Sequence, residues 1–152
     1  MKPILLFVTV LVMLGVPTLA LAGPKEDVAA ATQAWAEAFN SRDPARVLAL
    51  YDAEAVFWGT ISPTLRDNPE AIRDYFTNVI HMPTQALRVE LGEQRVRVYG
   101  DTAINTGSYT FSNVRDGQPV TTPARFSFTY RHKDGRWMIV DHHSSAMPSP
   151  PR

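Results

Sequence analysis

The chain has 152 residues, with 15 Lys and Arg, 15 Asp and Glu, and no cysteine. This length suits one domain with its own apolar core. The balanced charge excludes a basic surface for nucleic acid. The absence of cysteine excludes disulfides, thiol catalysis and metal–thiolate sites.

The first 22 residues have the pattern of an export signal. Lys2 precedes an apolar stretch from Ile4 to Leu21, and Ala20-Leu21-Ala22 places small residues where a signal peptidase reads them. A transmembrane anchor is the alternative, because the stretch is near the minimum of about 18 residues for a spanning helix. The Gly23-Pro24 break favours cleavage. We therefore expect a periplasmic or secreted protein without a membrane segment after cleavage.

The rest of the chain is expected to form one domain over residues 23–148, followed by a Pro-rich tail at 149–152. Apolar residues recur at helical spacing between Val28 and Phe39, which predicts an amphipathic helix over 25–40. Asp43-Pro44 has the pattern of an N-cap followed by proline at the first helical position. It predicts a short helix carrying Val47, Leu48 and Tyr51.

A brief strand is predicted at Ala55 to Trp58, and a third helix is predicted after it. Asn68-Pro69 repeats the cap pattern, and an apolar stripe from Ile72 to Val79 follows at helical spacing. Pro83 is expected to end this helix, because proline cannot continue it.

From Ala86 onward the apolar period changes to two, which predicts strands. Apolar residues lie at odd positions from Leu87 to Leu91 and at even positions at Val96 and Val98. Because side chains alternate between the faces of a strand, this change predicts a bulge near Gly92-Glu93.

Three further turns divide the remainder into long strands, at Gly100-Asp101, Asp116-Gly117 and Asp134-Gly135. Three helices with one short strand among them are thus followed by four long antiparallel strands. The economical packing is an α+β cone, in which the N-terminal helices pack in the concave face of a strongly bent, mainly antiparallel sheet.

The motifs of this chain resemble a known family. The arrangement is similar to the nuclear-transport-factor-2-like (NTF2-like, SnoaL-like) cone fold. Within that fold, the chain resembles the association (hub) domain of calcium/calmodulin-dependent protein kinase II, in a stand-alone bacterial form. The matching segments are Asp43-Pro44, Leu50-Tyr51 and residues 72–76, 107–111, 124–131 and 135–148.

The resemblance implies self-association, since the animal domain assembles kinase subunits into rings. It does not imply kinase activity, because the chain has no glycine-rich nucleotide loop or catalytic-loop signature. No basic amphipathic segment is visible, so calmodulin is not expected as a partner. The animal hub also has a basic pocket, and Phe128 and Ser144 stand where two of its arginines would fall. Arg66 and Arg125 are candidates for a different positive site.

The closing strand contains the residues with most chemical potential. Asp141 and His143 lie two apart, so they share a face with Trp137 and Ile139 under strict alternation. If that face lines the cone, Asp141 would orient His143 as a general base. A structural pair at the rim, or a subunit contact, is the alternative. His142 would point the opposite way, which makes His142-His143 a poor metal motif, and no metal or cofactor is expected.

Other residues are candidates for a ligand pocket. Asn105, Gly107 and Tyr109 share one face of a strand, where Gly107 would either leave room for a ligand or mark a bulge. Arg125 falls on the outer face unless a bulge turns it inward. The complete set of pocket candidates is Trp58, Arg66, Tyr75, Asn105, Tyr109, Arg125, Asp141 and His143.

Three functions remain open on this evidence. The first, which we favour, is an exported homo-oligomer, at least a dimer through its outer sheet face, whose cavity holds a small organic ligand. The second is an enzyme of the ketosteroid-isomerase or polyketide-cyclase kind, with Asp141, His143, Tyr75 and Asn105 as acid–base candidates. The third is an accessory subunit for a periplasmic partner.

Overall fold

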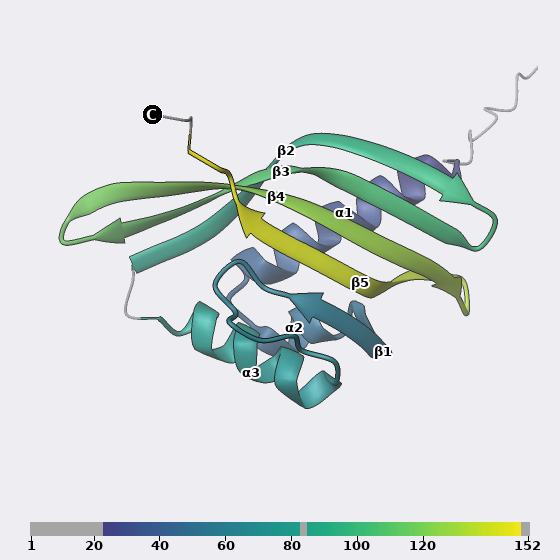
Figure 1. Cartoon of the computed structure of the whole chain (residues 1–152), viewed down its shortest axis with the longest axis horizontal. Helices are drawn as coiled ribbons and strands as arrows, with labels where there is room; N and C mark the ends of the chain where they lie inside the picture. Colours follow the sequence, from purple (N-terminus) through teal and green to yellow (C-terminus); the bar gives the residue numbers. More distant parts are fainter. Residues whose placement is uncertain (1–22, 83–84, 150–152) are drawn as a thin grey trace, which may run out of the picture.

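The computed structural model describes residues 23–82 and 85–149 (Figure 1). The predicted export signal at residues 1–22 and most of the Pro-rich tail lie outside this range. The described part contains three helices and five strands. Their bounds are α1 Pro24–Asn40, α2 Pro44–Leu48, β1 Tyr51–Trp58, α3 Pro69–Ile80, β2 Gln85–Tyr99, β3 Thr102–Arg115, β4 Gln118–Lys133 and β5 Arg136–Ala146.

The helices begin where the capping residues predict. The Asp43 carboxylate accepts a hydrogen bond of 2.9 Å from the Ala45 backbone N–H, and the Asn68 side chain accepts one of 2.9 Å from Ala71. Proline stands in the first turn of each helix, where its missing N–H has no intrahelical acceptor to lose. One boundary differs from prediction, because α2 ends at Leu48 and Tyr51 starts β1 instead.

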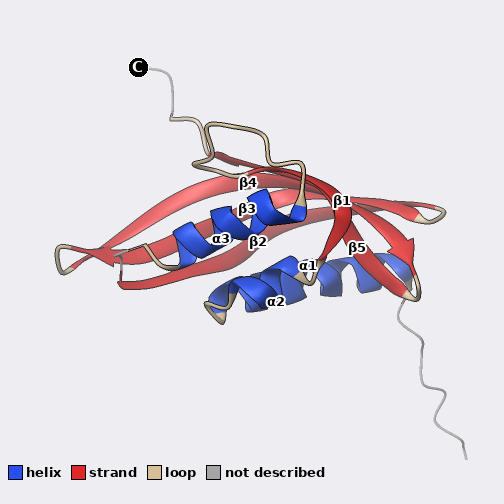
Figure 2. Cartoon of the chain, turned by 90° about the horizontal axis from the view of Figure 1, so that it is seen from below, coloured by secondary structure: helices blue, strands red, loops and turns tan. Residues whose placement is uncertain are grey.

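The five strands form one open sheet in the order β1-β5-β4-β3-β2. Strands β2 to β5 pair antiparallel with their sequence neighbours, as predicted, and β1 adds to β5 in parallel at the edge. Figure 2 shows that the sheet is curved and that all three helices lie on its concave side. The sheet therefore has one face against the helices and one face free of them.

The bulge predicted in β2 is present. Leu91 pairs with Tyr109 and Gln94 with Gly107, so Gly92 and Glu93 together oppose a single residue of β3. A Cβ on Gly107 would lie 2.8 Å from the Phe126 ring and against the backbone of the bulge. Gly107 therefore serves the close approach of the two strands, which is the bulge alternative.

A second bulge, in β5, was not predicted. Tyr130 of β4 pairs with Ile139, while the preceding Thr129 pairs with Asp141, so Val140 is the extra residue. This residue reverses the alternation of all side chains that follow it. Ile139 faces the helices before the bulge, and His142 and Ser144 do so after it.

The core between helices and sheet is unusually rich in rings. Trp35 of α1 is 1% exposed and lies at its centre, with the rings of Phe39, Tyr109 and Phe128 within 6 Å between centroids. Such pairs add to the hydrophobic free energy of burial. Among the described residues, no helix is long and apolar enough to cross a membrane.

Candidate functional site

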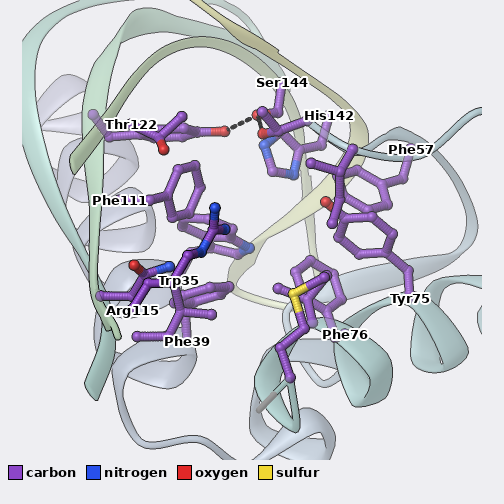
Figure 3. A pocket seen from close by; sticks show the side chains of 17 residues that line it. Trp35, Phe39, Phe57, Tyr75, Phe76, Phe111, Arg115, Thr122, His142 and Ser144 are labelled. Atoms are coloured by element: carbon purple, nitrogen blue, oxygen red, sulfur yellow. Dashed lines mark hydrogen bonds between the residues drawn. The ribbon is translucent and has the colours of Figure 1, made fainter. Parts of the chain in front are cut away.

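A cavity of about 190 Å³ opens between the helices and the concave face of the sheet (Figure 3). Side chains from α1, α3, the loop after β1 and strands β1 to β5 contribute to its wall. Most of them are aromatic or aliphatic, and the described lining residues include no Asp or Glu. They are Trp35, Phe39, Phe57, Thr60, Ile61, Tyr75, Phe76, Val79, Met82, Leu87, Tyr109, Phe111, Asn113, Arg115, Thr122, His142 and Ser144.

His142 is the most deeply buried polar side chain in this wall, at 1% exposure. Its Nδ1 lies 2.7 Å from the Tyr51 hydroxyl, which also accepts a hydrogen bond of 3.1 Å from the Trp35 indole N–H. If Tyr51 donates its one hydrogen to Nδ1, the Trp35 N–H, the Tyr51 hydroxyl and Nδ1 are all paired, and Nε2 of His142 is the group of these three side chains that is left. The opposite tautomer would leave both the Tyr51 hydrogen and Nε2 without a partner. We therefore assign the proton of His142 to Nε2.

Burial keeps this imidazole neutral. The surrounding apolar rings lower the pKa of His142 well below its usual value, and the charge of His143 lowers it further. The His142 ring stacks on Phe128 at 3.9 Å between centroids. His142 thus presents a neutral N–H donor, and Nε2 has no hydrogen-bond partner among the described residues.

A second polar group lies beside His142. The Tyr109 hydroxyl donates to Ser144 Oγ, and Ser144 Oγ also bonds to the Thr60 hydroxyl. Burial raises the pKa of Tyr109, so this phenol stays protonated. The arrangement joins β3, β5 and the loop after β1 at one end of the cavity, and it offers hydroxyl groups but no charge.

The end of β3 supplies a different chemistry to the cavity wall. Asn113 lines it with a buried side-chain oxygen that has no partner among the described residues. Arg115, two residues further on, is exposed and forms no ion pair within the described chain. In Figure 3 its side chain extends across the cavity from the β3 side. The cavity therefore has a neutral polar end and a cationic end.

The predicted orientation of Asp141 and His143 is wrong. Both side chains are exposed on the outer face of the sheet, whereas His142 and Ser144 face the cavity. The cause is the bulge at Val140, which shifts the alternation by one residue. The two adjacent histidines do point to opposite faces, as predicted. Partial burial raises the pKa of Asp141, although the nearby His143 opposes this effect.

Of the eight predicted pocket residues, Tyr75 and Tyr109 line the cavity. Trp58 is 41% exposed on the other side of β1. The Arg66 guanidinium donates to the Ala71 carbonyl at 3.0 Å and lies 5.5 Å from the centre of the Tyr75 ring. It therefore supports the cavity wall from behind and does not line the cavity.

The remaining two candidates also lie away from the cavity. Asn105 is fully buried, and its amide donates at 2.8 Å to Thr32 on α1 and at 2.8 Å to Gln94 on β2. It ties the first helix to the sheet, which is a structural role. Arg125 is exposed on the outer face and donates to Ser145 Oγ at 3.1 Å. Buried and exposed residues alternate regularly from Ala124 to Phe126, so Arg125 points outward and no bulge turns it toward the cavity.

Sequence reasoning missed the two polar residues that define the cavity's neutral end, His142 and Ser144. Trp35 and Phe76 belong to the core and line the cavity as well. The rings of His142, Trp35 and Tyr51 come from three separate elements, and no local spacing connects them.

The outer face carries its own row of side chains. Cross-strand pairing places Arg95, Thr106, Ser127, His143 and Trp58 side by side across all five strands. Four of the five are exposed, and Ser127 is half-buried. We call these five residues the outer row. Within the described residues, no group of three or more His, Asp or Glu side chains is arranged to hold a metal ion.

Comparison with known proteins adds three findings. The family model of the calcium/calmodulin dependent protein kinase II association domain matches residues 24–148. A solved structure from Xanthomonas campestris, described as a domain of that family, shares 32% identity over 88% of this chain and 94% of its own, with a TM-score of 0.76. The comparison with curated proteins gives no match.

Two more distant structures show the fold alone. The CaMKII hub of S. rosetta has a TM-score of 0.73 at 23% identity, covering 84% of this chain and all (100%) of its own. A Streptomyces avermitilis protein of the NTF2-like family, named as a dehydratase, has a TM-score of 0.73 at 20% identity, covering 82% and 96%. The predicted NTF2-like α+β cone is thereby confirmed.

Proposed function

Since this chain belongs to the calcium/calmodulin-dependent protein kinase II association domain family, we propose that it is an exported, self-associating binding protein. Its cavity holds a small organic ligand, and it has no kinase activity of its own. The export signal at residues 1–22 supports the location. The family supports self-association, because hub domains of this kind form oligomers.

The observation that carries the ligand proposal is the ring-lined cavity, whose wall includes His142, a residue with an Nε2–H that has no partner among the described residues. A buried donor without an acceptor costs free energy of about 1–3 kcal/mol. An oxygen of a bound ligand would remove that cost, and the ring-lined wall would take up the ligand's apolar part.

The outer row supports the proposed oligomer. It lies on the sheet face that no helix covers, and it includes the exposed Trp58 ring, of a residue type enriched in interfaces. On this proposal Asp141 and His143 are subunit contacts, which is the alternative that the sequence left open.

The acid–base enzyme has less support from the geometry. Of its four candidates, only Tyr75 lines the cavity. The described wall supplies no carboxylate, and the assigned tautomer of His142 leaves no free basic nitrogen facing a substrate. An accessory subunit would use the same outer face to bind a different protein. The number of subunits in the purified protein distinguishes this function from self-association.

Native mass spectrometry of residues 23–152 tests both parts. We expect at least a dimer carrying a small organic mass. Val79→Phe, which fills the cavity from α3, should lose that mass, whereas Thr64→Phe on the exposed loop should keep it. Ser127→Arg, at the centre of the outer row, should reduce the subunit count, and Asn78→Arg on α3 should not.

Two results would contradict the proposal. A monomer at micromolar concentration would exclude self-association. A wild-type protein without any bound organic mass, indistinguishable from Val79→Phe in the native spectrum, would exclude the ligand function.

A further inference from the structure

The open strand edges of the sheet differ in how their backbone groups are covered. Strand β1 forms one edge, where the N–H and C=O of Phe57 bond to the backbone of Arg66. Residues 118–123 of β4 extend beyond its pairing with β5, and Pro119 and Pro123 in this stretch have no N–H to offer. Strand β2 forms the other edge over 15 residues (Figure 1), and its two halves differ in cover.

Pairing with β3 fixes which backbone groups of β2 point to the edge. In an antiparallel pair, every second residue directs its N–H and C=O away from the neighbouring strand. Val89 is such a residue, because both of its groups bond to the Asn40 side chain, at 2.8 and 2.9 Å. Val89 pairs with residue 111 of β3, so the partners of residues 107, 105 and 103 point the same way. These partners are Gln94, Val96 and Val98.

Residues 94–99 of β2, which we call the open edge, have little cover. The Gln94 carbonyl accepts a hydrogen bond of 3.1 Å from the Arg95 guanidinium. Apart from the pairing with β3, no backbone hydrogen bond joins Val96 or Val98 to another described residue. No proline or bulge interrupts this stretch, which is about 20 Å long at 3.4 Å per residue. The open edge therefore presents a row of backbone donors and acceptors to solvent.

The side chains of the open edge are charged on one face and apolar on the other. Arg95 and Arg97 are exposed on the outer face, and Val96 and Val98 are half-buried on the helix face. Arg95 forms an exposed ion pair with Glu93 at 2.8 Å, and Arg97 forms none within the described chain. Because water and salt screen an exposed pair of this kind, both guanidinium groups can meet the charges of a partner.

These charges disfavour a second copy of the chain as the occupant. Antiparallel pairing of two open edges about Val96 would place Arg95 opposite Arg97 twice, and the neighbouring registers place one of these arginines opposite its own copy. Like charges directly opposite each other are destabilising, and charged side chains are one means by which proteins prevent edge-to-edge association. A strand with acidic side chains at these positions would gain ion pairs instead.

We propose that the open edge binds an extended acidic segment of a partner protein, which adds to the sheet as a further strand. The backbone of that segment pairs with the N–H and C=O groups of Val96 and Val98. Its acidic side chains, two residues apart, lie beside Arg95 and Arg97, and its apolar residues continue the helix face. The charges that reject another copy thereby select the partner. The proposal does not depend on the cavity or its ligand.

Synthetic peptides test the charge and backbone parts separately. Acetyl-Val-Glu-Val-Glu-Val-amide has the acidic pattern, and the same peptide with lysine in place of glutamate is its charge control. In an NMR titration of residues 23–152, the acidic peptide should bind at least about tenfold more tightly, because two ion pairs replace two repulsions. In a strand pair only alternate N–H groups face the protein. N-methylation of one alternate set of nitrogens in the acidic peptide should therefore abolish binding, and methylation of the other set should not.

Amide hydrogen exchange reports on the open edge directly. In the free protein, the N–H groups of Val96 and Val98 should exchange quickly, whereas those of Arg95 and Arg97, which face β3, should exchange slowly. The acidic peptide should slow the exchange of both valines. Slow exchange of both valines before any peptide is added would show that the edge is already covered, and would overturn the proposal.

Variants of the protein place the contacts. Arg95→Glu combined with Arg97→Glu should reverse the preference, so that the lysine peptide binds at least about tenfold more tightly than the acidic one. Arg73→Glu, at an exposed position on α3, is the control and should leave the preference unchanged. Val96→Pro removes an edge N–H without removing a bond to β3, and it should abolish binding. The charge reversal remains a test if the proline variant does not fold.

Three results would overturn the proposal. Equal affinity of the wild type for the acidic and lysine peptides would remove the selection by charge. The same response to methylation of either set of nitrogens would mean attraction by charge without strand addition. No binding of the acidic peptide at millimolar concentration would leave the open edge without its proposed partner.

Discussion

His142 and His143 are neighbours on β5 and differ in almost everything that surrounds them. His142 lies among rings, with Nδ1 bonded to Tyr51 and a pKa far below its usual value. His143 lies on the outer face between Trp58 of β1 and Ser127 of β4. The strand itself makes this difference, since alternating positions enter a low-dielectric core or meet water. On the function proposed above, the same residue type serves a ligand on one face of the sheet and a subunit contact on the other.

The largest expected difference between the two faces concerns their tryptophans. Trp35 is 1% exposed and Trp58 is 41% exposed. Trp35→Ala should lower the free energy of unfolding by about 3–5 kcal/mol, because it removes a ring from the centre of the core. Trp58→Ala should change it by about 1 kcal/mol or less and should weaken self-association instead. Urea unfolding at a protein concentration where the protein is monomeric measures the free energy of unfolding. Similar losses for both variants would contradict the placement of Trp35 in the core and Trp58 on the outer face.

The sequence predicts side-chain orientation better in β2 than in β5, although both strands contain a bulge. In β2 apolar residues stand on both sides of the bulge, from Leu87 to Leu91 and again at Val96 and Val98, so the change of parity is visible. In β5 the apolar markers Trp137 and Ile139 stand only before the bulge at Val140. Acid, imidazole and hydroxyl groups follow it, and these fit either face. The fold was therefore predictable, and the orientation of the site residues was not.

The parts of the site that come from separate elements were equally hidden. The Trp35–Tyr51–His142 chain of hydrogen bonds joins α1, β1 and β5. Its geometry depends on β1 pairing in parallel with β5 at the edge of the sheet. The sequence predicted only Ala55 to Trp58 as that strand and placed Tyr51 on a helix. Without Tyr51 in the sheet, there was no reason to expect a hydrogen-bond partner for His142.

A smaller difference is expected between two hydroxyl deletions. Tyr51→Phe leaves the Trp35 N–H and the His142 Nδ1 without partners in the core, which should cost about 1–3 kcal/mol of unfolding free energy. Ser145→Ala removes one hydrogen bond to the exposed Arg125, and water replaces it, so the change should be about 0.5 kcal/mol or less. Thermal unfolding of the two variants beside the wild type measures both. A cost for Ser145→Ala as large as that for Tyr51→Phe would show that the outer face is buried by a partner under the conditions used.

The last expected difference between the two histidines is in how the free energy of unfolding depends on pH. Because the folded-state pKa of His142 lies well below its unfolded value of about 6.5, the unfolded chain takes up a proton that the folded chain does not. This difference in proton uptake therefore has no effect above about pH 6.5. Below that pH, the free energy of unfolding falls by up to about 1.4 kcal/mol per pH unit. The raised pKa of Asp141 acts with the opposite sign at lower pH, so the measurement belongs between pH 7 and 5, with Asp141→Asn as a check. Chemical unfolding across this window should show the slope in the wild type and in His143→Gln. His142→Phe should lose it, and retention of the slope in that variant would mean that another histidine carries it.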